Sequence, residues 1–380
     1  MIGMKKILRI ILYPIILFIL FLRFAPLNFV KPIATVTPEI VINYARPDAL
    51  PVDLINSFPP DTTKLIIPQP RWQDDFEKQR KLVSKFKYEK LKAEKDIVEL
   101  HDLYFLRAGE DFLVTYHRRN HEMLVLSPNL NVNKIWPMQL RNGVKIDAPV
   151  DIAVKDETIW AIDRQGLVAS WNLSGVEQDH FASPVPARDI DLFENGDVLL
   201  HGTGMLPWLV ARTTNSGTLQ AYFAPQIYED SLEAELLLHS LVAVDRKNSR
   251  LCLAYKSPYK FIIYKSDGTA GRAVDITPNF QIAEPIIERE DGNIIKAGYQ
   301  KVIFEVAWHD DMLWILVSSE MGKAPQWLET FNTEGELLQR FALIDGVSRF
   351  AFLQNRLYVL GYAPNYRIEA YDMELMERPK

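Results

Sequence analysis

The chain has 380 residues, of which 48% are hydrophobic and 24% are charged. This balance is typical of a folded globular protein and excludes a largely disordered chain. The net charge of −6 argues against a general nucleic-acid binder, which carries a basic field over its domain, so we expect no nucleic-acid partner. Cys252 is the only cysteine, which excludes an intramolecular disulfide and a cysteine-rich metal site. Its strand-like surroundings indicate a small core residue rather than a nucleophile.

The first 30 residues have the pattern of a membrane anchor. Basic residues precede an apolar run that ends at Arg23, and about 13 apolar residues after a basic segment are typical of a secretory signal. Extension past Arg23 to Val30 gives about 21 residues, enough to cross a bilayer. No small-residue cleavage pair follows, so we predict an uncleaved, single-pass signal-anchor over residues 1–30, with the rest of the chain extracytoplasmic. The alternatives are a cleaved signal and a buried soluble helix. The predicted membrane-embedded residues are Ile10, Ile11, Leu12, Ile15, Ile16, Leu17, Phe18, Ile19, Leu20, Phe21 and Leu22.

Two segments of different character follow the anchor. Residues 31–70 are rich in proline, which predicts an extended stalk or a strap over the domain surface. Residues 71–96 place apolar side chains every three to four positions opposite a basic face, which predicts one amphipathic helix. The basic face either rests on anionic lipid headgroups or is simply solvated while the apolar stripe packs on the domain.

Residues 97–380 consist of short β-rich runs in which a hairpin-like unit recurs. Each copy has a short polar stretch, a glycine and then a β-run, because a tight turn between two strands requires a residue with positive φ. The turn glycines are Gly175, Gly217, Gly268 and Gly335. Two degenerate copies, at 126–130 and 371–375, lack the glycine.

Further apolar runs precede each hairpin and complete a unit of three or four strands. Six such units, spaced by about 40 to 60 residues, predict an all-β fold, a six-bladed β-propeller. An extra hairpin-like stretch at 285–296 is either an insertion or a seventh, degenerate blade, and we expect the insertion. The last unit leaves little room for a fourth strand, so we expect a strand from 31–70 to close the ring.

The repeat resembles that of the six-bladed propellers of the NHL-repeat and related exported families. The run Ile152–Val154, the strand after it and the turn at Gly175 match their apolar-Ala-Val run, strand and aromatic-Asp-x-x-Gly order. The resemblance covers about residues 97–375 and lacks the Asn-His-Arg signature of the NHL family. It therefore implies the architecture alone.

No linear motif in the chain assigns a catalytic residue, a metal site or a cofactor. His101, His117 and His121 fall in one unit, but no carboxylate stands at ligand spacing, so an exposed basic turn is the expectation. Gluconolactonase-like propellers hold a divalent cation in the central tunnel, and the corresponding positions cannot be assigned here. The tryptophans are expected to pack within blades, with one or two at a mouth of the tunnel.

Two functions remain open from the sequence. The first is a non-catalytic binding or scaffold propeller that contacts a partner protein, as an accessory subunit of a membrane complex. The second is a metal-dependent hydrolase or lactonase whose ligands converge in the central tunnel from different blades. The inventory of carboxylate, amide and imidazole groups that line the tunnel distinguishes the two.

Overall fold

The computed structural model describes most of the chain after residue 101 and two short strands before it. The chain divides into two compact units, Met1–Asn43 and Tyr44–Lys380, and every described residue belongs to the second. The described residues are 62–66, 88–90, 102–146, 148–202, 208–225, 240–257, 259–278, 280–283, 286–290, 293–318, 325, 327–342, 347–361 and 367–373. Among them no helix is long and apolar enough to cross a membrane. The predicted signal-anchor lies outside the described residues.

The first three blades are antiparallel sheets whose strands follow one another in sequence order from the middle of the ring outward. Blade one consists of β3 (Arg107–Ala108), β4 (Leu113–His117), β5 (Glu122–Leu126) and β6 (Val132–Pro137). Blade two consists of β7 (Pro149–Lys155), β8 (Thr158–Asp163), β9 (Leu167–Asn172) and β10 (Glu177–Ala182). Blade three consists of β11 (Ala187–Leu192), β12 (Val198–Gly202), β13 (Trp208–Thr213) and β14 (Leu219–Pro225).

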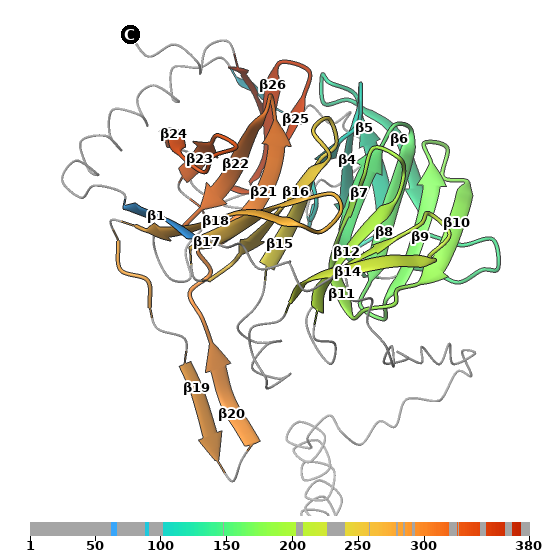
Figure 1. Ribbon diagram of the computed structural model, residues 1–380. Coiled ribbons are helices and arrows are strands. Elements are labelled where there is room, and N and C mark those ends of the chain that lie inside the picture. Colours follow the sequence, from blue (N-terminus) through green and yellow to red (C-terminus); the bar gives the residue numbers. More distant parts are fainter. Residues whose placement is uncertain are drawn as a thin grey trace, which may run out of the picture. The chain divides into compact units, whose positions relative to one another are not determined.

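The other three blades repeat this order (Figure 1). Blade four consists of β15 (Ser240–Asp245), β16 (Arg250–Tyr255), β17 (Lys260–Lys265) and β18 (Ala270–Thr277). Blade five consists of β21 (Ile303–His309), β22 (Met312–Val317), β23 (Trp327–Phe331) and β24 (Leu337–Ala342). Blade six consists of β25 (Val347–Leu353), β26 (Arg356–Gly361) and β27 (Arg367–Asp372), joined by a strand from the N-terminal side. The prediction of a six-bladed, all-β propeller is therefore confirmed.

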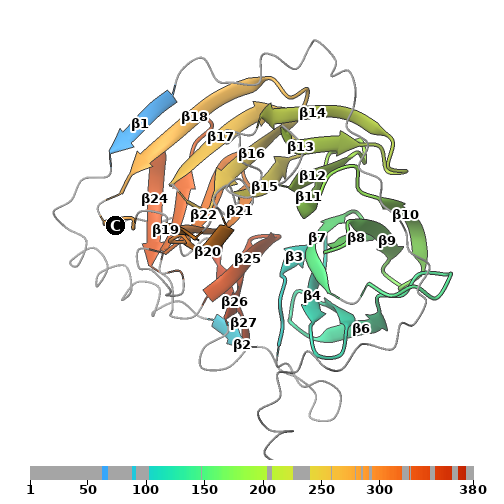
Figure 2. The same ribbon diagram turned by 90° about the horizontal axis from the view of Figure 1, so that it is seen from below.

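The ring is closed through contacts between innermost strands. β3 contacts β7, and contacts continue through β11, β15, β21 and β25 back to β3, as Figure 2 shows from one end of the ring. Hydrophobic clusters fill the space between neighbouring blades, one for each of the six junctions. Each blade is therefore covered on both faces, and for this reason strands such as β4, β12 and β23 are buried at every residue.

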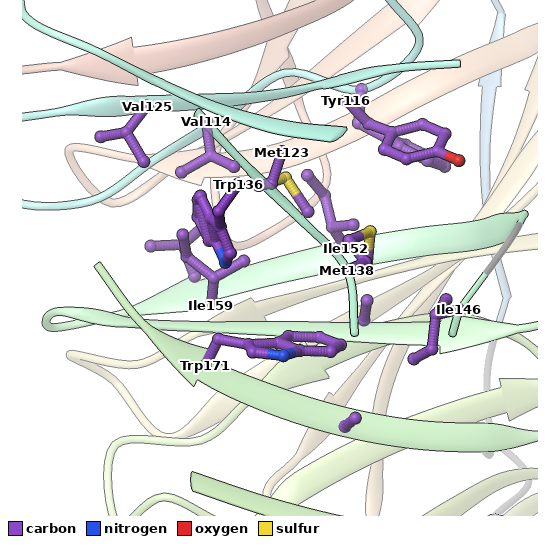
Figure 3. Close-up of a cluster of buried hydrophobic side chains, with 14 of the residues drawn as sticks. Val114, Tyr116, Met123, Val125, Trp136, Met138, Ile146, Ile152, Ile159 and Trp171 are labelled. Carbon is purple, nitrogen blue, oxygen red and sulfur yellow. The ribbon is translucent and has the colours of Figure 1, made fainter. Parts of the chain in front are cut away.

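The junction of blades one and two illustrates this packing (Figure 3). Val114 and Trp136 of blade one share a cluster with Ile152 and Trp171 of blade two. The Trp171 side chain is fully buried, and burial of one large apolar side chain contributes about 1.5–3 kcal/mol.

Two strands from before the first blade join the propeller. β2 (Tyr88–Lys90) pairs with β27 and supplies the outermost strand of blade six. β1 (Thr62–Ile66) pairs in parallel with β18 and adds a fifth strand to blade four. The expectation that a strand from 31–70 closes the ring is therefore wrong: β1 pairs with blade four, and the strand that completes blade six comes from the segment 71–96. Within that segment the structure describes only β2, which is a strand where a helix was expected; the rest lies outside the described residues.

The stretch predicted as an insertion or a seventh blade is an insertion. It forms β19 (Ile286–Glu290) and β20 (Asn293–Gly298), and among the described strands these two pair only with each other. This hairpin leaves the ring between blades four and five and extends away from the blades in Figure 1.

Candidate functional site

The central channel of the propeller is lined by the innermost strand of each blade, β3, β7, β11, β15, β21 and β25. We call the end at which these strands begin the proximal end, and the end at which they finish the distal end. Charged side chains gather toward the proximal end, and a cavity lies toward the distal end.

Four of the six inner strands carry an irregularity at the same place. In β7, β11, β21 and β25 the register against the neighbouring strand shifts between the first and the third residue. A β-bulge of this kind re-aims the side chains that follow it. The third residues are Asp151, Asp189, Glu305 and Arg349. The bulges therefore bring four charged residues to equivalent positions in four blades.

Arg107 connects three blades through buried ion pairs. Its Nη2 atom lies 2.8 Å from Asp151 Oδ1, and its Nη1 atom lies 3.3 Å from Glu305 Oε2. Arg349 Nε lies 3.1 Å from the same Glu305 oxygen. The side chains of Asp151 and Glu305 are only 6% and 5% exposed. Burial alone disfavours a charged guanidinium, but Glu305 and Asp151 outweigh it and raise the pKa of Arg107 above its ordinary value.

Carboxylates of the channel also bind backbone groups of the next blade. Asp151 Oδ2, in blade two, accepts a hydrogen bond of 3.1 Å from the N–H of Ile190 in blade three. Asp189 Oδ2, in blade three, accepts a hydrogen bond of 2.8 Å from the N–H of Val242 in blade four. Asp191 does the same with the N–H of Val244 at 2.7 Å. These carboxylates therefore hold blades two, three and four together along the channel wall.

Asp189 and Asp151 form a carboxyl pair across blades two and three. The pKa of Asp189 lies well above its ordinary value of 3.8, because burial disfavours the carboxylate and Asp151 adds a like charge and a hydrogen bond. Arg107 and the N–H of Val242 act in the opposite direction without cancelling the effect. Asp189 therefore holds a proton more readily than an isolated aspartic acid does.

A cavity of about 380 Å³ occupies the distal part of the channel. All six blades line it, from Leu106–Ala108 in blade one to Phe350–Phe352 in blade six, and Arg107 belongs to its wall. Its polar groups have partners within the protein: Arg246 donates to the carbonyl of Leu192 at 3.1 Å, and Trp308 Nε1 donates to that of Ala243 at 3.2 Å. The cavity has room for a small molecule, and the described groups around it are engaged in holding the blades together.

Within the described part of the chain, no three His, Cys, Asp or Glu side chains are grouped as a metal site requires. The channel carboxylates are instead engaged by arginines and backbone N–H groups, as set out above. This is the arrangement of a structural ion-pair network rather than of an open ligand set.

The exposed basic turn expected from the sequence is present at residues 118–121 and includes His121, whereas His117 lies in the strand before it. His117 is 1% exposed, and its Nδ1 atom accepts the N–H of Asn120 at 3.1 Å. His121 Nδ1 lies 3.0 Å from the hydroxyl of Tyr116. His117 is buried because it is the last residue of β4, which neighbouring blades cover on both faces, whereas the turn residues after it are exposed. His101 lies outside the described residues.

Other residues singled out from the sequence have structural positions. Cys252 is fully buried in the core, as expected. Trp171, Trp314 and Trp327 are buried within the blades, and Trp308 lines the distal cavity. Gly175, Gly217, Gly268 and Gly335 each lie in the turn between the third and fourth strands of a blade, with φ between 75° and 86°. The predicted membrane-embedded residues lie outside the described residues.

The channel charges were missed from sequence, although a signal for them exists. Asp151 and Glu305 each interrupt or begin an otherwise apolar run of the repeat, where a charge is costly unless it is paired. The repetition of this feature in several units is what points to a shared buried network.

Comparisons with known proteins agree on the fold. No family model and no curated protein matches the sequence. Among solved structures, the chain is similar to a Bacteroides fragilis protein described as exported, with 8% identity, 82% of this chain and 99% of that chain covered, and a TM-score of 0.51. It is also similar to a member of the DUF4221 family from Bacteroides vulgatus, with 10% identity, coverage of 75% and 96%, and a TM-score of 0.51. At such identities the likeness shows the propeller fold alone.

Proposed function

We propose that the protein is a non-catalytic binding module held at the extracytoplasmic face of a membrane by residues 1–30. In this proposal the propeller docks a partner protein, as an accessory subunit of a membrane complex. The observation that carries the proposal is the hairpin β19–β20, which no blade needs for its own sheet.

The hairpin has the properties of a docking element for a polypeptide strand. A two-stranded sheet is marginally stable by itself, and a third strand from a partner would supply main-chain hydrogen bonds to its open edge. Ile286 is 40% exposed, and Glu288, Arg289 and Glu290 are exposed beside it. Charged residues along an edge strand disfavour indiscriminate pairing, which suits an arm with one specific partner.

The channel supports the same proposal. Its described carboxylates are engaged by Arg107, Arg349 and backbone N–H groups, which leaves the hydrolase hypothesis without an open set of ligands among the described residues. An exported protein of the same fold, the one from B. fragilis, provides a precedent for the extracytoplasmic location.

Site-specific photo-crosslinking in the source cells tests the docking element. A photoreactive phenylalanine derivative at Glu290, in the hairpin, is expected to give one discrete crosslinked product, because this residue lies at the docking edge. The same replacement at Glu157, an exposed residue in the turn between β7 and β8, is the matched control and is expected to give none.

The product is then identified, and the purified partner is titrated against the full-length protein and against a variant in which Ile286–Gly298 is replaced by a short Gly-Ser linker. We expect at least a tenfold loss of affinity in the variant. Equal crosslinking from both positions, or unchanged affinity without the hairpin, would contradict the proposal. So would a divalent metal that copurifies in stoichiometric amount and is lost in Glu305→Gln.

A further inference from the structure

The proximal end of the channel carries two lysines that lack an acidic partner. Lys256 follows the last residue of β16, which pairs with the first residue of β15, and Lys301 lies two residues before the start of β21. Both therefore stand where inner strands begin. Their backbones are adjacent, because the carbonyl of Lys256 accepts the N–H of Val302 at 2.7 Å. Blades four and five thus bring the two lysines together.

Neither ammonium group has an ion pair among the described residues. Lys301 Nζ lies 4.1 Å from the centroid of the Phe304 ring, a cation–π contact that does not neutralise its charge. Both lysines are half-buried. A charge in such a position is costly, and a protein normally pairs it.

The carboxylates that act on the lysines are engaged by other groups. Glu305 and Asp151 are paired with Arg107 and Arg349, and Asp189 accepts the N–H of Val242. The described cationic and acidic groups that interact there are Arg107, Arg246, Arg349, Lys256, Lys301, Asp151, Asp189, Asp191 and Glu305.

The electrostatics of the lysines agree with an unneutralised site. The pKa of Lys301 lies well below 10.5, because burial and then the positive charges of Arg349 and Lys256 disfavour its charged form, against a smaller effect of Glu305. The pKa of Lys256 is lowered as well, chiefly by burial. An anion bound between them would relieve both effects.

We propose that Lys256 and Lys301, with Arg349, form a binding site for a doubly charged oxyanion at the proximal mouth of the channel. The ligand carries a phosphate group or two carboxylates, since each of the two ammonium groups without an ion pair can then contact one negative charge. Lysine ammonium groups bind such oxygens as compact point charges. The site is separate from the hairpin and does not depend on the docking of a protein partner.

Calorimetric titration of the full-length protein, in non-ionic detergent and at constant ionic strength set with chloride, tests the site. Inorganic phosphate and succinate are the two probes. We expect saturable binding of at least one, and the one that binds identifies the ligand chemistry. Lys256→Met and Lys301→Met should each weaken binding at least tenfold. Lys247→Met removes an exposed lysine at the opposite end of the channel and should leave binding unchanged.

A second measurement uses the unaltered protein and is independent of how the variants fold. At pH 9, binding should draw protons onto the lysines, so the heat of binding should differ between buffers of different ionisation enthalpy. Absence of binding of both probes, an affinity in the two lysine variants equal to that of the unaltered protein, or a heat that is the same in every buffer would each overturn the proposal.

Discussion

At the scale of single residues, the channel shows how buried charge can serve as a connection between blades. Each blade of a propeller touches its neighbours mainly through apolar side chains, which pack without a fixed register. Asp151 and Asp189 add directional contacts, because each carboxylate accepts an N–H group from one chosen position in the next blade. The network fixes how neighbouring inner strands align along the channel.

The raised pKa of Asp189 leads to a prediction about pH. Below its ordinary pKa of 3.8 the carboxyl is protonated in both folded and unfolded states, and at higher pH only the folded state holds the proton until the raised pKa is passed. The contribution of this group to the free energy of unfolding is therefore present below pH 3.8 and is lost as the pH rises toward the raised value. Asp189→Asn keeps a neutral group at every pH. The thermal midpoint of this variant, taken relative to that of the unaltered protein, should thus rise as the pH is raised from 4 to 8.

Asp267→Asn is the control of opposite sign. The N–H of Thr269 donates to Asp267 at 2.8 Å and is the main cause that lowers the pKa of this carboxyl below 3.8. The contribution of Asp267 to stability is present above pH 3.8 and is lost as the pH falls. The thermal midpoint of Asp267→Asn, taken relative to that of the unaltered protein, should therefore decrease as the pH rises. If the thermal midpoints of Asp189→Asn and the unaltered protein differ by the same amount at every pH, the raised pKa of Asp189 is contradicted.

At the scale of elements, the turn between the third and fourth strands of a blade has two roles. The backbone at Gly175 has φ 75°, and a Cβ atom at this position would overlap the indole ring of Trp136 on the outer strand of the preceding blade. The glycine therefore both closes its own hairpin and allows the neighbouring blade to approach closely.

A pair of variants separates these two roles. Gly196 lies in another turn with φ 85°, and a Cβ atom there would meet nothing within 4 Å. Gly196→Ala should lower the free energy of unfolding by about 1–2 kcal/mol, the cost of a left-handed backbone. Gly175→Ala should cost about 1–3 kcal/mol more, because Trp136 must also move. Chemical denaturation measures both, and equal losses would show that the contact with Trp136 is unimportant.

How far the sequence predicts these elements depends on the range of the interaction that forms them. The turn glycines can be predicted from the local sequence, because the positive φ that they adopt is required by the turn itself. The turn at 126–130 is harder to read, because buried Leu130 adopts φ 62° where a glycine is expected. The pairing of β2 with β27 joins segments at opposite ends of the propeller sequence, and no local pattern specifies it. The meeting of Arg107 with Glu305 is likewise a consequence of ring closure.

At the scale of the whole molecule, the proposed membrane attachment is open to a direct test. Full-length protein should remain in the membrane pellet after alkaline carbonate extraction, because about 20 apolar residues are expected to span the bilayer. Replacement of residues 1–30 by a cleavable signal peptide should release the exported propeller in soluble form. Intact full-length protein in the carbonate supernatant would contradict an anchored chain.

The position of β2 also orders the events of biosynthesis. This strand emerges from the ribosome before any blade, yet its partner β27 is the last strand of blade six. The circle of blades can be sealed only after blade six has been synthesised, and until then β2 has no partner strand to pair with. Pairing over so long a stretch of sequence is slow, so we infer that the pairing of β2 with β27 is a late step of folding. It is also the step that incomplete synthesis of the chain would most readily prevent.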